Sequence, residues 1–131
     1  MNCLVITNNP QVPELLSHLE VLRVEGSVLD IYILARDYIH KGHFLITHPL
    51  SGSLKPGKTP YKSVVLSGER KNLDLQSLHL IESSIETYHN TFSRAAQKLK
   101  TGMLKDYATI DLSHLEAALE SLNSQLNKCQ L

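Results

Sequence analysis

The segment CLVITNNP, residues 3–10, contains a short run of β-rich apolar residues that ends in three turn residues. The run Cys3–Thr7 therefore predicts a buried strand. Residues 13–18 suit a short helix that begins with proline, and residues 21–24 (VLRV) predict a second strand that stops at Gly26. A strand, a helix and a strand in this order indicate an α/β fold with a mainly parallel sheet.

The clearest helical pattern lies directly after the second predicted strand. Ser27 and Asp30 have the spacing of a capping box, and Gly42 stands where a helix commonly ends. Between them, apolar residues recur at helical spacing: Val28, Ile31, Leu34, Ala35 and Tyr38. Residues 44–47 (FLIT) and 63–66 (SVVL) then predict a third and a fourth strand. The whole pattern predicts a small, mainly parallel, Rossmann-like three-layer sheet of about four strands.

A long loop separates the last two predicted strands. Residues 48–60 contain three prolines and two glycines, which disfavour the helix that a parallel crossover usually contains. We therefore expect the fourth strand to run antiparallel to the others. That direction places the whole loop at the carboxyl ends of the other strands.

The second half of the chain has no strand pattern. Residues 74–101 predict a long helix, broken at Gly102, whose apolar stripe is Leu78, Ile81, Ile85, Tyr88, Phe92, Ala95 and Leu99. The same spacing recurs in Leu112, Leu115, Leu119, Leu122, Leu126 and Cys129. Ser113 and Glu116 are spaced as another capping box. We expect a two-helix antiparallel hairpin over residues 74–131 that covers the sheet. Part of the hairpin can also project and pair with a second copy, which predicts a homodimer through these helices.

Length and composition limit the class of protein. The 131 residues suit a single domain, with an α/β half over residues 1–68 and a helical half after it. Thirteen basic and 13 acidic side chains leave no net field to attract nucleic acid, so no nucleic-acid partner is expected. No apolar segment approaches the roughly 20 residues that span a bilayer, and the first residues do not resemble a signal peptide. We expect a cytoplasmic protein without a membrane partner.

The two cysteines, Cys3 and Cys129, lie at opposite ends of the chain. They show neither the C-x-x-C spacing of a zinc ribbon nor the density of a disulfide framework. The sequence therefore predicts no disulfide scaffold.

GSLKPGKT, residues 52–59, matches the Walker A pattern G-x-x-x-x-G-K-[ST] of phosphate-binding loops. Such a loop needs a helix that begins at its Lys-Thr pair, because the helix N-terminus binds the phosphates. Here Pro60 disfavours helical backbone at Thr59, and residues 61–66 (YKSVVL) predict a strand. We expect the match to be coincidental. Without a phosphate loop, the lysines of this segment are either solvent-exposed without a ligand, or Lys55, Lys58 and Lys62 bind an anion less specifically.

Four short stretches carry a family resemblance: TNNP (7–10), RD with HKGH (36–43), HPLSGS (48–53) and TPYKS (59–63). Over about residues 3–67 the chain resembles the GrdX family, small proteins encoded within glycine, sarcosine and betaine reductase gene clusters of anaerobic bacteria. The resemblance implies an association with that reductase system and a possible reductase-system partner. It carries over no activity and no catalytic residue.

Polar residues gather where the predicted strands end, which is where open α/β sheets bind ligands. The candidate ligand-binding residues are Thr7, Asn8, Asn9, Ser27, His48, Ser51, Gly52, Ser53, Lys55, Thr59, Tyr61 and Lys62. Amide and hydroxyl groups both donate and accept hydrogen bonds, so such a set suits a small anion or an amino-acid-like ligand. The alternative is structural: the asparagines form a turn, Ser27 caps a helix and the serines satisfy the loop's own backbone.

No pattern in the chain predicts catalysis. His40, His43 and His48 flank a predicted strand and need not face one point, so no metal is expected, and no nucleophile is spaced with a base. The sequence predicts no cofactor. It favours a non-catalytic accessory or regulatory protein. The alternative is a small-molecule or anion-binding protein, or a small enzyme, with a pocket at the carboxyl ends of the strands.

Overall fold

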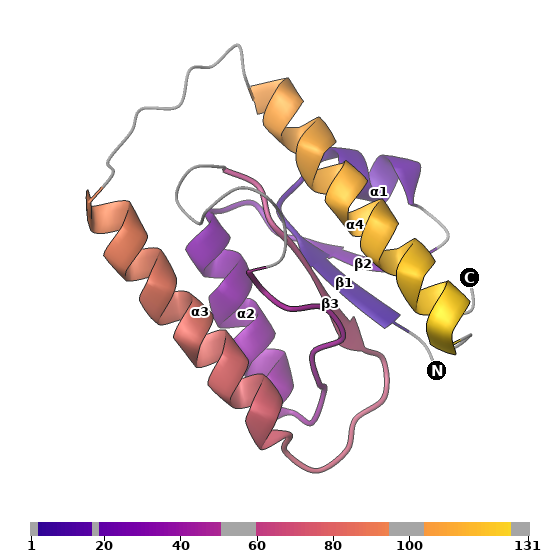
Figure 1. Cartoon of the computed structure of the whole chain (residues 1–131), viewed down its shortest axis with the longest axis vertical. Coiled ribbons are helices and arrows are strands. Elements are labelled where there is room, and N and C mark those ends of the chain that lie inside the picture. The colour runs from indigo at the N-terminus through magenta and orange to yellow at the C-terminus, as the bar shows by residue number, and fades with distance from the viewer. Residues whose placement is uncertain (1–2, 17–18, 51–59, 95–103, 127–131) are drawn as a thin grey trace.

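The computed structural model describes residues 3–16, 19–50, 60–94 and 104–126. The elements follow the order β1 (Cys3–Thr7), α1 (Gln11–Leu15), β2 (Glu20–Arg23), α2 (Val28–His40), β3 (Ser63–Ser67), α3 (Leu75–Arg94) and α4 (Leu104–Leu126). The sheet lies in the middle, with α2 and α3 to one side and α1 and α4 to the other (Figure 1). The predicted α/β fold, with two long helices at the C-terminus, is confirmed.

The described sheet is mixed, with three strands in the order β2-β1-β3. β1 pairs with β2 in parallel, and Leu4 lies opposite Glu20. β1 pairs with β3 in the antiparallel direction, and Val5 lies opposite Val65. The expected direction of the last strand is therefore confirmed, whereas the expectation of a mainly parallel sheet is wrong.

The strand expected at residues 44–47 does not form. Leu45 makes one isolated bridge to Leu66, and the amides of Ile46 and Thr47 both donate to the Val65 carbonyl oxygen. The Thr47 hydroxyl accepts the Val65 N–H at 3.1 Å, in place of a backbone carbonyl. A side chain that competes for backbone groups in this way interrupts a ladder. The prediction of about four strands is therefore wrong, and this segment only borders β3.

Each face of the sheet carries its own core, as the alternation of side chains along a strand requires. Leu4 and Ile6 of β1 pack with α2 and α3, together with Ile31 and Ile81. The opposite face packs with α1 and α4, through Cys3, Val5, Val12, Val65, Leu112, Leu115 and Leu119. The molecule is thus a three-layer sandwich, as expected.

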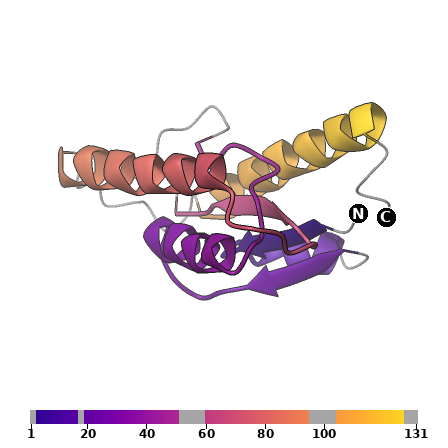
Figure 2. The ribbon, with the colours of Figure 1, turned by 90° about the horizontal axis from the view of Figure 1, so that it is seen from below.

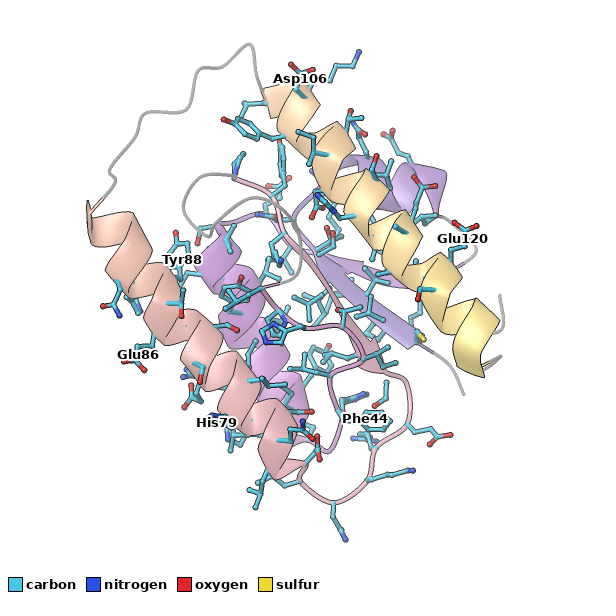
Figure 3. The ribbon with its side chains drawn as sticks, in the orientation of Figure 1. Phe44, His79, Glu86, Tyr88, Asp106 and Glu120 are labelled. Atoms are coloured by element: carbon cyan, nitrogen blue, oxygen red, sulfur yellow. The ribbon has the colours of Figure 1, made fainter. Side chains whose placement is uncertain are left out.

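The two C-terminal helices do not pack together as a hairpin. Within the described residues α3 lies against α2, whereas α4 lies against α1 and β3 (Figure 2). Tyr88 points from α3 toward α2, and Glu86 points away from it (Figure 3). The described stripe residues thus belong to the two cores: Leu78, Ile81, Ile85 and Tyr88 on α3, and Leu112, Leu115 and Leu119 on α4. The hairpin prediction is wrong because a stripe that covers a sheet has much the same spacing as a seam between two helices.

The helix boundaries also differ from those expected. α4 begins at Leu104, so Ser113 and Glu116 lie inside the helix and do not cap it. α1 begins at Gln11 rather than at Pro13. The stripe positions Ala95, Leu99 and Cys129 lie outside the described residues, and so do the side chains of Phe92, Leu122 and Leu126.

Both ends of α2 are closed as the sequence predicts. At the first turn the Asp30 N–H donates to the Ser27 hydroxyl, and the Ser27 N–H donates to the Asp30 carboxylate at 2.8 Å. At the last turn Gly42 adopts a φ of 107°. Its N–H donates to the Ile39 carbonyl, and the His43 N–H donates to the Tyr38 carbonyl. This pair of bonds is a Schellman motif.

Cys3 is disulfide-bonded, which the positions of the two cysteines did not predict. The sequence contains one other cysteine, Cys129, outside the described residues. A disulfide depends on the distance between the two Cβ atoms in the fold, not on separation along the chain.

Tyr32 is the largest fully buried side chain of the described residues. Its hydroxyl donates to the Pro49 carbonyl at 3.0 Å, and its ring meets the Tyr88 ring edge to face at 6.5 Å. Burial, with a smaller contribution from Tyr88, raises the pKa of the Tyr32 hydroxyl. The folded protein therefore holds this proton more tightly than the unfolded chain does.

We expect Tyr32→Phe to lower the free energy of unfolding by about 1–2 kcal/mol near neutral pH, because the buried Pro49 carbonyl loses its donor. A raised pKa stabilises the folded state below the unfolded pKa of about 10, and that contribution is lost as the pH rises above it. The difference between wild type and variant should therefore shrink above about pH 10. Urea denaturation of both proteins, near neutral pH and near pH 10.5, measures it. If wild type and Tyr32→Phe differed in unfolding free energy by the same amount at both pH values, the raised pKa of the Tyr32 hydroxyl would be contradicted.

Candidate functional site

The polar edge is the site at the carboxyl end of β1. It is formed by Thr7, Asn8 and Asn9 with Lys62, Ser63 and Asp111. Thr7 and Ser63 face each other with hydroxyl oxygens 2.8 Å apart, and the Ser63 hydroxyl donates to the Asp111 carboxylate at 2.7 Å. Because a carboxylate only accepts, the proton order is fixed: Thr7 donates to Ser63, and Ser63 donates to Asp111. The chain of bonds joins β1, β3 and α4.

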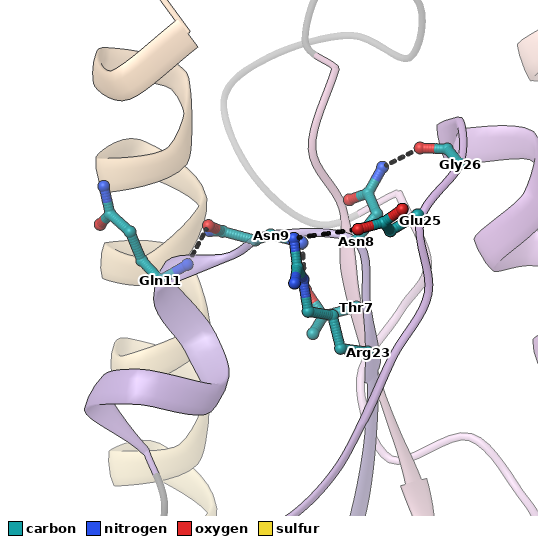
Figure 4. Close-up of polar contacts among 7 residues, drawn as sticks. All are labelled: Thr7, Asn8, Asn9, Gln11, Arg23, Glu25 and Gly26. Carbon is teal, nitrogen blue, oxygen red and sulfur yellow. Dashed lines mark hydrogen bonds and ion pairs between the residues drawn. The ribbon is translucent and has the colours of Figure 1, made fainter.

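Asn9 is fully buried, and both N–H groups and the oxygen of its amide make internal hydrogen bonds. Its nitrogen donates to the Ala108 carbonyl at 2.8 Å and to the Asp111 carboxylate at 3.0 Å. Its oxygen accepts the Gln11 N–H at 3.0 Å, at the start of α1 (Figure 4). Asn9 therefore ties α1 and α4 to the end of β1.

Asn8 makes corresponding hydrogen bonds on the other side of β1. Its nitrogen donates to the carbonyls of Gly26 and Pro60 at 2.9 and 2.8 Å, and its oxygen accepts the Lys62 N–H at 2.8 Å. The bond to Gly26 is drawn in Figure 4. Asn8 thus joins the loop before α2 to the end of the long loop before β3. Asn8 and Asn9 thus both lie at the end of β1, where their amides bind neighbouring parts of the chain.

The other candidate residues are distributed differently. Ser27 serves as the cap of α2, and His48 is exposed and accepts the Leu50 N–H at 3.0 Å through its Nδ1 atom. Tyr61 is half-buried beside Lys62. Five candidates lie outside the described residues: Ser51, Gly52, Ser53, Lys55 and Thr59.

Sequence reasoning missed two members of the polar edge, Ser63 and Asp111. Together with Thr47, Lys62 and His114 they line a cleft of about 20 Å³, which is room for roughly one water molecule. Burial lowers the pKa of Lys62, and the nearby Asp111 carboxylate opposes that shift. The only sequence signal was the i, i+3 spacing of Asp111 and His114 on one helix, which is too common to mark a site.

The Walker-like residues 52–59 lie outside the described part of the chain, but the segment directly after them is described. Residues 60–62 are not helical, and Ser63–Ser67 is a strand. The helix N-terminus that a phosphate loop requires after its Lys-Thr pair is therefore not present in residues 60–67. This agrees with the interpretation of the match as coincidental.

No three His, Cys, Asp or Glu side chains of the described residues come together as a metal site. His43 instead contacts the Ser67 carbonyl through its Nδ1 atom at 2.7 Å. Among the described helices, none has the length and apolar character needed to cross a bilayer.

The fold and the polar edge define a small three-layer α/β protein whose strand ends are closed by amide hydrogen bonds. The chain belongs to the GrdX-like protein family, whose family model matches residues 4–120. The match includes α3 and most of α4, and so extends beyond the residues 3–67 over which the resemblance was recognised. Comparison with curated proteins and with solved structures found no match.

Proposed function

We propose that this protein is a non-catalytic accessory or regulatory component that acts beside a glycine, sarcosine or betaine reductase system. The association rests on the family, whose members are encoded with those reductases. The non-catalytic part rests on one observation, the internal hydrogen bonding of Asn8 and Asn9.

A side chain that binds or activates a substrate must offer it a donor or an acceptor. Both N–H groups and the oxygen of Asn9 are engaged with α1 and α4. Those of Asn8 are engaged with both neighbouring loops. A ligand could use the N–H donors of these amides only by breaking bonds that hold the layers together, at a cost of roughly 1–3 kcal/mol for each buried group left unpaired. The arrangement favours a structural role for the polar edge.

Direct binding tests the proposal. Purified protein is titrated against each purified component of a glycine reductase, and substrate turnover by the protein alone is measured in parallel. We expect saturable binding to a reductase component, equal affinity for a His48→Ala variant, and no turnover of glycine, sarcosine or betaine. Turnover by the isolated protein that His48→Ala abolishes would refute the non-catalytic role. Absence of binding to every component would refute the association.

A homodimer through the C-terminal helices remains a prediction. The described stripes of α3 and α4 lie in the two cores, so a dimer would have to use the outer faces of these helices. On α4 that face includes Ile110, which is 39% exposed. Sedimentation velocity over a hundredfold range of concentration decides between monomer and dimer.

The alternative is a small anion or amino-acid-like ligand held at the polar edge. It is favoured by the half-buried Lys62, whose side chain lines the cleft with Ser63 and His114. A thermal-shift screen against phosphate, acetyl phosphate, glycine, sarcosine, betaine and adenine nucleotides tests it, because a ligand of the native state raises apparent stability. A concentration-dependent shift that Lys62→Met abolishes would favour this alternative. We expect no shift at millimolar concentrations.

A further inference from the structure

The amino-end cavity is a second and larger cavity of the described residues, with a volume of about 360 Å³. One wall is formed by Leu4 of β1 with Glu20, Val21 and Leu22 of β2. Leu4 and Glu20 are paired near the start of both strands, so the cavity lies at the opposite end of the sheet from the polar edge. Its volume falls in the range of roughly 300–1,000 Å³ that is usual for small-molecule sites.

The Schellman motif at the end of α2 builds the opposite wall. It brings Tyr38, Lys41 and His43 to the cavity from one turn of chain. The Tyr38 ring packs edge to face on the His43 ring, with centroids 5.3 Å apart. The Lys41 ammonium lies 4.9 Å from the centroid of the same Tyr38 ring. The three side chains therefore hold one another in place.

A second loop fixes this wall and adds Arg70 to the cavity. The Lys71 N–H donates to the Gly42 carbonyl at 2.9 Å, directly after Arg70. His43 donates through its Nδ1 atom to the Ser67 carbonyl at 2.7 Å, because a carbonyl only accepts. That bond leaves the second ring nitrogen of His43 for other contacts. The cavity walls are thus set by backbone hydrogen bonds before any ligand arrives, which lowers the entropic cost of binding.

The charges of the amino-end cavity are unequal. Lys41 and Arg70 are cationic and form no ion pair with any described residue. Glu20 is the one acidic side chain of the lining. Lysine and arginine side chains both recognise carboxylates, and the apolar strand wall suits a hydrocarbon group. Glu20 disfavours a second negative charge on the same ligand.

We propose that the amino-end cavity binds a small molecule that carries a single carboxylate and an apolar body. The carboxylate contacts Lys41 and Arg70, and the apolar body lies on Leu4 and Leu22. This site is separate from the polar edge and independent of the proposed association with a reductase.

The test uses hexanoate and phenylacetate as probes, with hexanamide and phenylacetamide as uncharged controls. Titration of the isotope-labelled full chain is followed by amide NMR shifts, which report both affinity and location. We expect saturable binding of the acids with a dissociation constant of about 1 mM or lower, and amides that bind at least about tenfold more weakly. The shifts should centre on residues 20–22, 38–43 and 70.

Variants complete the test. We expect Lys41→Gln combined with Arg70→Gln to weaken hexanoate binding at least about tenfold, whereas the exposed Lys105→Gln on α4 leaves it unchanged. Amide spectra of the double variant without ligand confirm that it is folded. Equal affinity for acids and amides, shifts centred on Asn8 and Asn9, or no binding at about 10 mM would each overturn the proposal.

Discussion

Replacing Asn9 by leucine is expected to lower the free energy of unfolding by about 3 kcal/mol. Leucine has the same branched shape at Cγ and is larger than asparagine, so the change removes hydrogen bonds without opening a cavity. It leaves the Gln11 N–H without its acceptor and takes one of two described donors from the Asp111 carboxylate. Both groups lie at the junction of α1, α4 and β1. Urea denaturation of wild type and variant measures the effect.

Two further variants show whether the hydrogen bonds are responsible. Gln11→Ala removes only an exposed side-chain contact of 3.4 Å to Thr109, and should change stability by no more than about 0.5 kcal/mol. Asn9→Asp keeps the shape but puts a carboxylate against Asp111. Like charges raise the folded pKa of such a pair, so stability should recover as the pH falls. Wild-type stability for Asn9→Leu would show that the polar edge does not hold the layers together.

Gly42→Ala is the second substitution with a large expected effect, about 3 kcal/mol of unfolding free energy. Gly42 has a φ of 107°, which residues with a side chain rarely adopt. An added Cβ would also overlap the Lys71 carbonyl oxygen, a backbone atom that cannot move aside alone. The strain falls on the Schellman motif and on the loop that carries Arg70. The variant should therefore lose hexanoate binding as well as stability.

Gly26→Ala is the matched control for this prediction. There the added Cβ would meet the end of the Asp30 side chain, which can rotate away at the cost of part of the capping box. We expect no more than about 1 kcal/mol of destabilisation. Equal losses in thermal or urea denaturation for the two glycine variants would contradict the special role of Gly42.

Local sequence patterns predicted what local interactions control. The Ser27 and Asp30 cap, the glycine that ends α2 and the buried strand β1 all appear as expected, because each depends on residues close in sequence. The strand expected at residues 44–47 does not form because the Thr47 hydroxyl accepts the Val65 N–H in place of a backbone carbonyl. The hairpin prediction is wrong because helical spacing shows which face of a helix is apolar, but not which element that face packs against.

The location of the polar edge could be predicted from the sequence, but its role could not. The positions of Thr7, Asn8 and Asn9 after a strand indicated that they would lie at the edge where the strands end. Asp111, a partner of Asn9, lies 102 residues after it, so no local pattern could show that this amide is already occupied. The amino-end cavity was not predicted at all. It is assembled from a helix cap, a loop and a strand wall that share no motif.

In the function that we propose, this GrdX-like protein acts on a reductase system without performing chemistry itself. The most direct test adds the purified protein back to extracts of a strain that lacks its gene and follows the rate of glycine reduction. We expect the rate of glycine reduction to change and then to level off at a fixed ratio of protein to reductase. The His48→Ala variant should give the same curve. No change at any ratio, or a rate that rises in proportion to wild-type protein and is lost with His48→Ala, would contradict it.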